Sequence, residues 1–395
     1  MISEKDLSKD QKEVYKNVLK WFKDKNDLIL RVGGFAGSGK TTILSLLAKK
    51  FGDSTAFCCY TGKAASVLRS KLDKLKIDYS YCGTIHGLIY RPVIDSKTLE
   101  VIGWARKNSM KESFIVIDEA SMVGEKMWGD LTRFGTKILV VGDHFQLPPI
   151  NSVINLMDKP DLRLEKIHRQ AEDNPIIKLS MLARNGHSIK DFRVDDDRVV
   201  HVSKYDYDKI EQFFTEIFVN RDPLESAVLS FFNNTRVTNN KIIREICDKG
   251  KEPEEDDLVI CLKNVHGKTQ SVFNGMRGVV QSSVKLNSHV YNMDISFPYE
   301  DIDISENISR HQFGQPYTFA NILDLKKFGM RPKNWGEVGL LFDYGYSLTV
   351  HKAQGSQFEN VMVFVERLKK LEEEYFNRWL YTAITRSSIN LALVY

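Results

Sequence analysis

Cysteine is scarce in this chain, and long apolar runs are absent. The 395 residues include 5 cysteines. Five cysteines in so long a chain exclude a small disulfide scaffold. They form no C-x-x-C pair and no Cys/His spacing typical of metal ligands, so we expect buried, reduced thiols and not a metal site. No apolar run approaches the roughly 20 residues that cross a bilayer. Residues 1–6 are charged and lack the apolar core of a signal peptide. We therefore expect a cytoplasmic protein with no membrane partner, and no metal site built on its cysteines.

Repeats, low-complexity tracts and Pro/Gly-rich linkers are also missing. Hydrophobic residues make up 42% of the chain and charged residues 27%, which is typical of globular domains and excludes a disordered or collagen-like chain. The length suffices for two to four domains. The net charge is +4, and the basic surplus lies in the first 150 residues. This asymmetry favours a polyanionic partner for that part of the chain.

Apolar stretches and helix-period stretches alternate through the first 150 residues. The expected strands are residues 28–32, 55–60, 114–117 and 137–141, and the expected helices are 42–51 and 63–75. Short apolar strands separated by helices predict a parallel sheet with helices on both faces.

The same pattern returns in the second half of the chain, with a break. Helices are expected at 174–185, 207–219, 235–249 and 368–386, and strands at 227–232, 361–365 and 391–394. An acidic stretch at 252–257 precedes an alternating, turn-rich region that continues to about residue 341, and this region predicts a small β insertion. The sequence therefore predicts two α/β cores, the second of which is interrupted.

A glycine-rich loop joins the first expected strand to its helix. Residues 34–41 read GFAGSGKT and match the pattern GxxxxGK[ST]. Glycines let backbone amides turn inward around a triphosphate, and the following helix presents its positive N-terminal end. Lys40 would reach the β- and γ-phosphates and Thr41 would hold Mg²⁺, so the pattern predicts ATP and Mg²⁺ as cofactors. A plain glycine turn before a helix is the alternative. The expected nucleotide contacts are Gly34, Ala36, Gly37, Ser38, Gly39, Lys40, Thr41 and Thr42.

Two adjacent acids, Asp118 and Glu119, follow the buried strand expected at 114–117. Two carboxylates repel each other unless a cation joins them. We expect Asp118 to bind Mg²⁺ and Glu119 to orient and deprotonate an attacking water, a pair suited to hydrolysis. A third strand runs into GDHFQLPP at 142–149, where the uncharged amide of Gln146 is placed to contact the γ-phosphate and report its loss. A turn built by Gly-Asp and Pro-Pro is the alternative reading of that segment.

The loop, the acidic pair and GDHFQLPP together resemble the motifs of superfamily-1 helicases. Three later segments are similar to further motifs of these enzymes: LEKIHRQ at 164–170, YSLTVHKAQGS at 346–356 and LYTAITR at 380–386. The wording HKAQGSQF is specific to the RecD/Dda-like branch, whose members translocate 5′→3′. The resemblance covers nearly the whole chain and is weakest across 185–225 and 280–335. The compact length is similar to that of phage Dda-type helicases.

The resemblance implies an α/β fold with two RecA-like P-loop domains, each built on a parallel sheet. Residues 1–88 and 109–160 would form the first motor domain, with a β-hairpin pin inserted at 89–108. Residues 161–255 and 342–395 would form the second, with a small SH3-like β domain inserted at 256–341.

The resemblance also implies roles for single residues around the nucleotide. Gln11 matches a glutamine that reads the adenine edge, although a surface Gln at a helix start is the alternative. Arg169 and Arg386 match two arginines that reach across the interdomain cleft to the γ-phosphate, where they would stabilise the transferring phosphoryl group. Gly355 is a further expected nucleotide contact.

Two groups of residues match DNA-contacting motifs of the family. Thr61, Gly62 and Lys63 lie at a strand end before a helix, where a hydroxyl, backbone amides and an ammonium would hold backbone phosphates; a helix N-cap by Thr61 is compatible with this role. The remaining expected DNA contacts are Thr84 and His86 in the first domain and Asn233, Thr349, His351 and Lys352 in the second.

Residues 90–104 are expected to form a β-hairpin with a polar tip. In the family a short pin at this place stacks against a base and splits the duplex. Tyr90 or Trp104 would be the stacking group, because stacking on an aromatic side chain is worth roughly 1–3 kcal/mol per base. Burial of Trp104 against the core is the alternative.

These features predict an ATP-dependent helicase that translocates 5′→3′ on single-stranded DNA and separates duplex strands. The first alternative is a DNA-dependent ATPase that remodels nucleoprotein without productive unwinding. An inert regulatory subunit and a small-molecule kinase are weaker alternatives. We expect a monomer in the cytosol of a bacterium or of a phage-infected host. Single-stranded DNA and forked duplex DNA are its expected partners, and a single-strand-binding or replisome protein is a further candidate.

Overall fold

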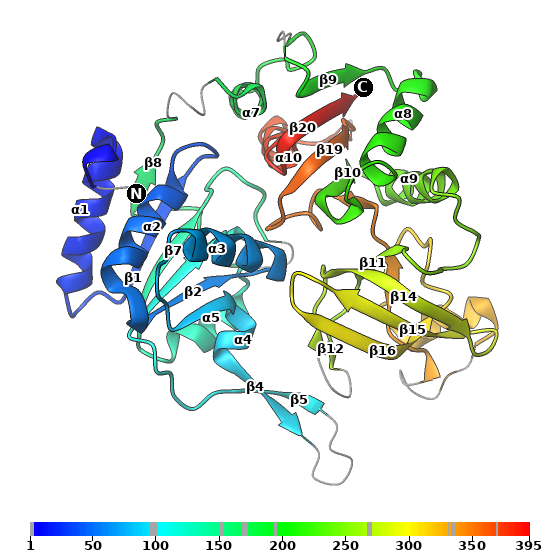
Figure 1. Cartoon of the computed structure of the whole chain (residues 1–395), viewed down its shortest axis with the longest axis horizontal. Coiled ribbons are helices and arrows are strands. Elements are labelled where there is room, and N and C mark those ends of the chain that lie inside the picture. Colours follow the sequence, from blue (N-terminus) through cyan, green and yellow to red (C-terminus); the bar gives the residue numbers. More distant parts are fainter. Residues whose placement is uncertain are drawn as a thin grey trace.

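The structure, a computed structural model, describes residues 4–94, 101–149, 153–167, 173–192, 196–266, 271–330, 332, 337–368 and 370–395. Its larger sheets are two of parallel strands and one of antiparallel strands (Figure 1), and two antiparallel strand pairs accompany them. The first lobe, at the left of the view, is built on one parallel sheet and the second lobe on the other. This arrangement confirms the predicted α/β fold with two parallel sheets. No helix in the described ranges has the length and apolar character needed to cross a membrane.

The first lobe carries a six-stranded sheet in the order β3-β2-β6-β7-β1-β8. Its strands are β1 (Ile29–Gly34), β2 (Thr55–Cys59), β3 (Tyr81–Thr84), β6 (Phe114–Asp118), β7 (Lys137–Gly142) and β8 (Leu162–Leu164). All pairings are parallel, so the ends of β1, β6 and β7 meet at one edge. That edge therefore brings together the glycine-rich loop, the acidic pair and the GDHFQLPP segment.

Helices pack on both faces of this first sheet. They are α1 (Lys9–Lys23), α2 (Lys40–Phe51), α3 (Gly62–Lys74), α4 (Ile85–Ile89) and α5 (Glu125–Thr132). Helix α1 begins at a capping box in which Ser8 and Gln11 satisfy each other's backbone amides. Its buried face, with Val14, Val18 and Trp21, joins the apolar cluster beneath β1 and β6.

The second lobe carries a five-stranded sheet in the order β18-β10-β19-β20-β9. Its strands are β9 (Val199–Val202), β10 (Ser226–Ser230), β18 (Ser347–Thr349), β19 (Phe358–Phe364) and β20 (Ser387–Val394), and its helices are α7 (Pro175–Arg184), α8 (Tyr207–Phe218), α9 (Asn233–Ile246) and α10 (Glu373–Ile384). Short 3₁₀ helices lie at Glu4–Asp6, Gly52–Ser54, Ala120–Met122, Pro223–Glu225 and Ile322–Phe328.

An antiparallel sheet interrupts the second lobe between α9 and β18. Its order is β16-β15-β14-β11-β17, with β11 (Leu258–Cys261), β14 (Arg277–Lys285), β15 (Val290–Phe297), β16 (Ile302–Ser309) and β17 (Phe342–Tyr344). A two-stranded ribbon, β12 (Val265–His266) with β13 (Ser271–Val272), adjoins it. Alternate burial along β15 places its apolar side chains in a separate core. We call this part the β insertion.

A second antiparallel pair projects from the first lobe at the bottom of Figure 1. It pairs β4 (Tyr90–Ile94) with β5 (Val101–Arg106), so that Tyr90 faces Arg106 and Pro92 faces Trp104. The sequence predicted a hairpin at this place. Its tip, residues 95–100, lies outside the described residues.

Several element boundaries differ from the predictions. Strand β17 belongs to the sheet of the β insertion, whereas the predicted insertion ended at residue 341. Strand β8 pairs with β1 in the first sheet, whereas the predicted second domain already began at residue 161. Strand β10 ends at Ser230 and α9 begins at Asn233, because the backbone of residue 232 is extended and starts a new helix. Helix α10 begins at Glu373, not 368. Local periodicity does not fix these ends, because helix termini depend on the caps that the fold supplies.

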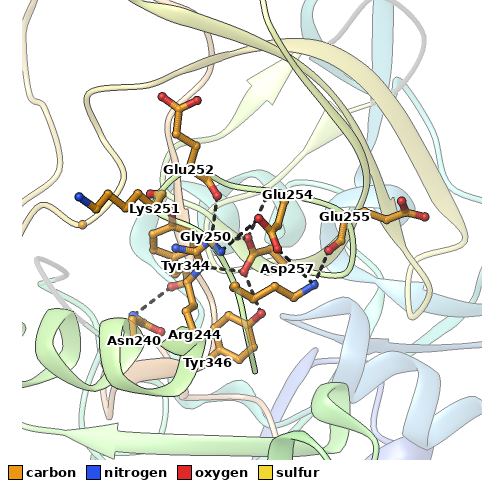
Figure 2. Close-up of polar contacts among 12 residues, drawn as sticks. Asn240, Arg244, Gly250, Lys251, Glu252, Glu254, Glu255, Asp257, Tyr344 and Tyr346 are labelled. Carbon is orange, nitrogen blue, oxygen red and sulfur yellow. Dashed lines mark hydrogen bonds and ion pairs between the residues drawn. The ribbon is translucent and has the colours of Figure 1, made fainter. Parts of the chain in front are cut away.

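Buried ion pairs fix the joint between the second lobe and the β insertion (Figure 2). Arg244 of α9 donates two hydrogen bonds to Asp257, at 2.8 and 2.9 Å, and a third to the Glu252 carbonyl at 2.8 Å. The Tyr346 hydroxyl donates to the same carboxylate at 2.9 Å. Both charged side chains are nearly inaccessible, with 6% and 0% exposed. The acidic stretch thus serves partly as an internal counter-charge for α9.

Asp257→Asn should lower the free energy of unfolding by about 3–5 kcal/mol, because it leaves the Arg244 guanidinium buried without a counter-charge. Denaturant unfolding measures this change. The matched control is Glu216→Gln, which alters an exposed pair with Arg221 at 2.7 Å and should cost less than about 1 kcal/mol. Equal effects of the two variants would contradict a structural role for the buried pair.

Candidate nucleotide site and nucleic-acid interface

The glycine-rich loop between β1 and α2 is folded as a cradle. Gly37 and Gly39 have φ of +78° and +82°, a left-handed backbone that side chains with a Cβ adopt only at a cost. Gly34 has no space for a Cβ, which would lie 2.7 Å from the Ser38 Oγ. Lys40 Nζ donates to the carbonyls of Gly34 and Phe35 at 2.7 and 2.9 Å. The Lys40 side chain therefore reaches back across the loop, and its ammonium lies where it could also contact a bound phosphate.

A cavity of about 940 Å³ lies at this loop and is bounded by both lobes. Helix α2 points its N-terminus into it, so its free amides and partial positive charge suit an anion. Most of the expected nucleotide residues line the cavity, whereas Gly34 and Ser38 shape the loop. The expected residues that line it are Gln11, Ala36, Gly37, Gly39, Lys40, Thr41, Thr42, Asp118, Glu119, Gln146, Gly355 and Arg386.

Gln11 connects α1 to the loop. Its Oε1 accepts from the Ser8 amide at 3.0 Å, and its Nε2 donates to the Ser38 carbonyl at 3.3 Å. The side chain is 4% exposed. Gln11 thus holds the start of α1 against the loop at the margin of the cavity, where an adenine contact remains a prediction.

The acidic pair lines the same cavity as Lys40. Burial, and next the charge of Glu119, raise the pKa of Asp118 to about 6. Glu119 has φ of +53° and donates its amide to Asp118 Oδ1 at 2.9 Å. Its Oε2 is buried and accepts no hydrogen bond from the described residues. Such a carboxylate oxygen needs a cation or a donor that the chain does not supply.

These oxygen donors fit Mg²⁺. Thr41 and Asp118 line the same cavity, and Mg²⁺ is commonly held by one or two carboxylates together with substrate phosphates. Among the described residues there is no cluster of three His, Cys, Asp or Glu side chains that would bind a metal by itself. A site that is completed by the phosphates of a nucleotide agrees with both observations.

The GDHFQLPP segment contacts the second lobe as well as the cavity. Gln146 is buried, and its Oε1 has no hydrogen-bond partner among the described residues. The neighbouring Leu147 donates its amide to Thr382 Oγ1 at 3.0 Å and accepts from Gln354 Nε2 at 2.6 Å. The unpaired side-chain oxygen of Gln146 thus lies next to Leu147, whose backbone is hydrogen-bonded to Thr382 and Gln354 of the second lobe. We call these two hydrogen bonds the Leu147 clamp.

Of the two arginines predicted to reach the γ-phosphate, the structure describes only Arg386. Arg386 is 3% exposed and lines the cavity, where it donates to the carbonyls of Ser356 and Thr382 at 2.9 and 3.1 Å. These bonds hold the guanidinium at the end of α10, facing the phosphate loop of the other lobe. Arg169 lies outside the described residues, so its predicted role remains a prediction.

Besides Thr382 and Gln354, sequence reasoning missed further residues of the second lobe that contact the first. The Tyr381 hydroxyl accepts from the Ala36 amide at 2.8 Å and donates to Asp143. Arg184 lies 3.7 Å from the ring centre of Phe35, and Arg378 donates to the His144 carbonyl at 3.2 Å. The LYTAITR motif contained Tyr381, but its partners lie hundreds of residues away in the sequence and had no local signal.

The expected DNA contacts of the first lobe meet in one pocket of about 240 Å³, which Thr61, Gly62, Lys63, Thr84 and His86 line. Thr61 caps α3 and also donates to the Gly355 carbonyl at 2.7 Å, so it bridges the lobes. Thr84 caps α4 by accepting from the Gly87 amide. Both hydroxyls thus have structural partners in addition to any phosphate.

Lys63 is buried beneath the second lobe and the β insertion. Its ammonium donates to Leu224 O, Glu225 Oε2 and Tyr299 Oη at 3.0–3.1 Å, so its three N–H groups are all used. Burial lowers the pKa of Lys63 to about 8, partly opposed by Glu225. A phosphate contact by Lys63 therefore requires these bonds to break. Beside it, Glu300 lies so close to Gly62 that a Cβ there would approach its Oε1 to 2.0 Å.

An aromatic cluster joins the base of the hairpin to the β insertion. The ring of His86 lies 4.6 Å from Tyr90, 4.7 Å from Trp104 and 4.3 Å from Phe273, measured between centroids. The Tyr90 hydroxyl donates to Asp130 at 2.7 Å. Both candidate stacking residues therefore already have partners at the base of the hairpin, and Trp104 is half-buried there.

The expected contacts of the second lobe also share a pocket. Asn233, Thr349, His351 and Lys352 line about 250 Å³ near Tyr317. Burial lowers the pKa of His351 and of Lys352, and His351 Nε2 is 2.7 Å from the Tyr375 hydroxyl. The fold thus gathers four residues from two separated segments into one concave patch, with Asn233 exposed.

Comparison with known proteins agrees with this geometry. The family described as an AAA domain matches residues 6–204, about half of the chain, and the UvrD-like helicase C-terminal domain matches residues 344–394. The RecBCD subunit RecD of Buchnera aphidicola is 27% identical over 433 aligned positions, covering 92% of this chain and 69% of that protein. The ATP-dependent RecD2 DNA helicase of Deinococcus radiodurans is 30% identical over 165 positions, covering 38% of this chain and 21% of that protein.

Solved structures agree at the level of the fold. Bacteroides Pif1 bound to single-stranded DNA superimposes with a TM-score of 0.50 and 17% identity, covering 100% of this chain and 92% of the Pif1 chain. A Pif1 structure described as unwinding forked double-stranded DNA gives the same TM-score at 19% identity, with the same coverage. The motifs, the two-lobed cavity and the sequence matches together show that the chain belongs to the AAA domain family and to the superfamily-1 helicases of the RecD-like branch.

Proposed function

We propose that this chain is an ATP-driven motor that moves 5′→3′ along single-stranded DNA and separates the strands of a forked duplex. One observation carries the proposal: a single nucleotide-sized cavity is walled by the phosphate loop of one lobe and by Arg386 of the other. Hydrolysis in such a cavity changes the attraction between the lobes. Direction rests on the resemblance to RecD-like enzymes.

Residues of the cavity have separate roles in ATP hydrolysis. Lys40 and the loop amides bind the β- and γ-phosphates, and Arg386 stabilises charge on the phosphoryl group as it transfers. Glu119, with its unpaired oxygen, takes the proton of the attacking water. Mg²⁺, held by Thr41 and Asp118, would neutralise phosphate charge. Gln146 contacts the γ-phosphate and transmits its loss through the Leu147 clamp.

Movement follows when each lobe grips the strand in a different phase of the cycle. The first lobe offers the pocket of Thr61, Thr84 and His86, and the second offers the pocket of Asn233 and Thr349. Nucleotide binding favours the closed arrangement and hydrolysis releases it, so tightening alternates between the pockets. The hairpin at Tyr90 and Trp104 would divide the duplex ahead of the moving strand.

The remaining expectations belong to the same proposal. The motor acts as a monomer in the cytoplasm, and a single-strand-binding or replisome protein is a candidate partner. A translocase that remodels nucleoprotein without unwinding is the alternative function, since it would use the same cavity. A small-molecule kinase has no use for an arginine from a second lobe at the phosphate loop.

Glu119→Gln should leave ATP binding within threefold of wild type and lower DNA-stimulated hydrolysis at least 100-fold, because an amide cannot accept the proton of the water. Titration with a fluorescent ATP analogue and a phosphate-release assay measure the two effects. Glu125→Gln, an exposed acid at the start of α5, is the matched control and should change neither. A hydrolysis rate within threefold of wild type in Glu119→Gln would exclude Glu119 as the base.

Forked substrates with one tail test direction and strand separation together. A duplex with only a 5′ single-stranded tail should be unwound at least tenfold faster than one with only a 3′ tail, and Lys40→Ala should unwind neither. Strand separation is followed by fluorescence, with ATP hydrolysis measured in parallel. Preference for the 3′ tail would overturn the direction, and DNA-stimulated hydrolysis without strand separation would establish the translocase instead.

A further inference from the structure

One hydroxyl of the second lobe lies between two elements of the nucleotide cavity in the first. Tyr381 is on α10 and is 1% exposed. Its Oη accepts from the Ala36 amide of the phosphate loop at 2.8 Å and donates to Asp143 Oδ2, three residues before Gln146. Burial, and next the charge of Asp143, raise the pKa of Tyr381 well above its ordinary value, so the hydroxyl keeps the proton that it donates.

The Tyr381 hydroxyl supplies hydrogen bonds that Asp143 and the Ala36 amide need. Asp143 is 1% exposed, and its hydrogen-bond donors among the described residues are the Phe145 amide, at 3.0 Å, and Tyr381. A buried carboxylate is costly when its donors are lost. The Ala36 amide lies in the loop before Gly37, where the backbone must turn toward a phosphate. A small movement of α10 therefore changes the environment of the loop and of the Gln146 segment at once.

The same helix carries the other contacts across the seam. Thr382 accepts from the Leu147 amide at 3.0 Å, and its carbonyl accepts from Arg386 Nε at 3.1 Å. The Phe145 ring lies edge-on to the Tyr381 ring, with centroids 5.4 Å apart. Arg386, just beyond the end of α10, is thus hydrogen-bonded to the residue that follows Tyr381, so all three residues are attached to the same end of this helix.

We propose that Tyr381 is a positioning residue that couples the nucleotide cavity to the grip on DNA, because its hydroxyl holds the phosphate loop and Asp143 in register with the end of α10. The inference rests on the proposed function, since it presupposes a motor in which nucleotide and DNA affect each other. Without the hydroxyl, each lobe keeps its own fold, and the signal between the lobes is lost.

The chain supplies a matched control within the second lobe. The Tyr346 hydroxyl also donates to a buried carboxylate, Asp257 Oδ1, at 2.9 Å, and Tyr346 is likewise 1% exposed (Figure 2). Tyr346→Phe and Tyr381→Phe each remove one hydroxyl from one buried acid. Only Tyr381→Phe removes a bond between lobes, so a difference between the variants isolates coupling from the loss of a buried hydrogen bond.

The test measures coupling directly. The Kd for a single-stranded oligonucleotide is measured without nucleotide and with AMP-PNP, and kcat and KM for ATP are measured with and without the oligonucleotide. In Tyr381→Phe the AMP-PNP-dependent change in Kd should shrink at least fivefold and DNA-stimulated kcat should fall at least tenfold, with KM for ATP within threefold of wild type. Tyr346→Phe should retain the wild-type coupling and stimulation.

The outcomes separate this inference from the function on which it rests. A wild-type protein with no DNA stimulation and no nucleotide effect on Kd would overturn the proposed function and the inference with it. A coupled wild type, with Tyr381→Phe equally coupled or with Tyr346→Phe equally impaired, would overturn the inference alone. Should Tyr381→Phe fail to fold, Asp143→Asn keeps the shape of the acceptor and weakens the same bond. It should reduce coupling in the same direction, and wild-type coupling in it would also overturn the inference.

Discussion

The structure depends on a buried seam between the lobes in which specific hydrogen bonds accompany the apolar packing of Leu147 against the second lobe. Where the two lobes meet around the cavity, they are joined by hydrogen bonds between single side chains and backbone groups: Tyr381 to Ala36, Thr382 and Gln354 to Leu147, and Thr61 to Gly355. Each such bond contributes only about 1 kcal/mol net, because water replaces it when the seam opens. A seam of this kind specifies the closed geometry and can still be opened by the binding or loss of a phosphate.

The second lobe and the β insertion are joined more firmly, by buried ion pairs. Arg244 with Asp257 and Arg236 with Asp343 are ion pairs with side chains at most 6% exposed, and they attach the β insertion to α9 on both of its connections. Breaking one partner of such a pair is costly. The β insertion and the second lobe therefore move as one body. Because Tyr299 and Glu225 both contact Lys63, the DNA contact proposed for this lysine would require the body to move away from it.

Much of the fold and part of the site could be predicted from sequence, for a definite reason. Parallel strands are apolar runs, and their carboxyl ends share one edge, so Gly34, Asp118 and Gln146 had to approach one another once the strands were recognised. The limits of α10 and the membership of β8 could not be predicted, because they depend on caps and on a neighbouring strand. The roles of Tyr90 and Trp104 also stayed open, since both aromatic side chains pack with His86 at the base of the hairpin.

The sequence by itself determined the chemistry. The pattern GFAGSGKT, the adjacent acids and LYTAITR predict a phosphate-binding loop, a pair of acids suited to hydrolysis and an arginine for the γ-phosphate, because backbone torsion and side-chain type are local properties. Only the tertiary structure decided which hydroxyl reaches which loop and which lysine is already paired. Tyr381 and Ala36 are separated by 345 positions, and no local preference records a contact made by packing one lobe against another.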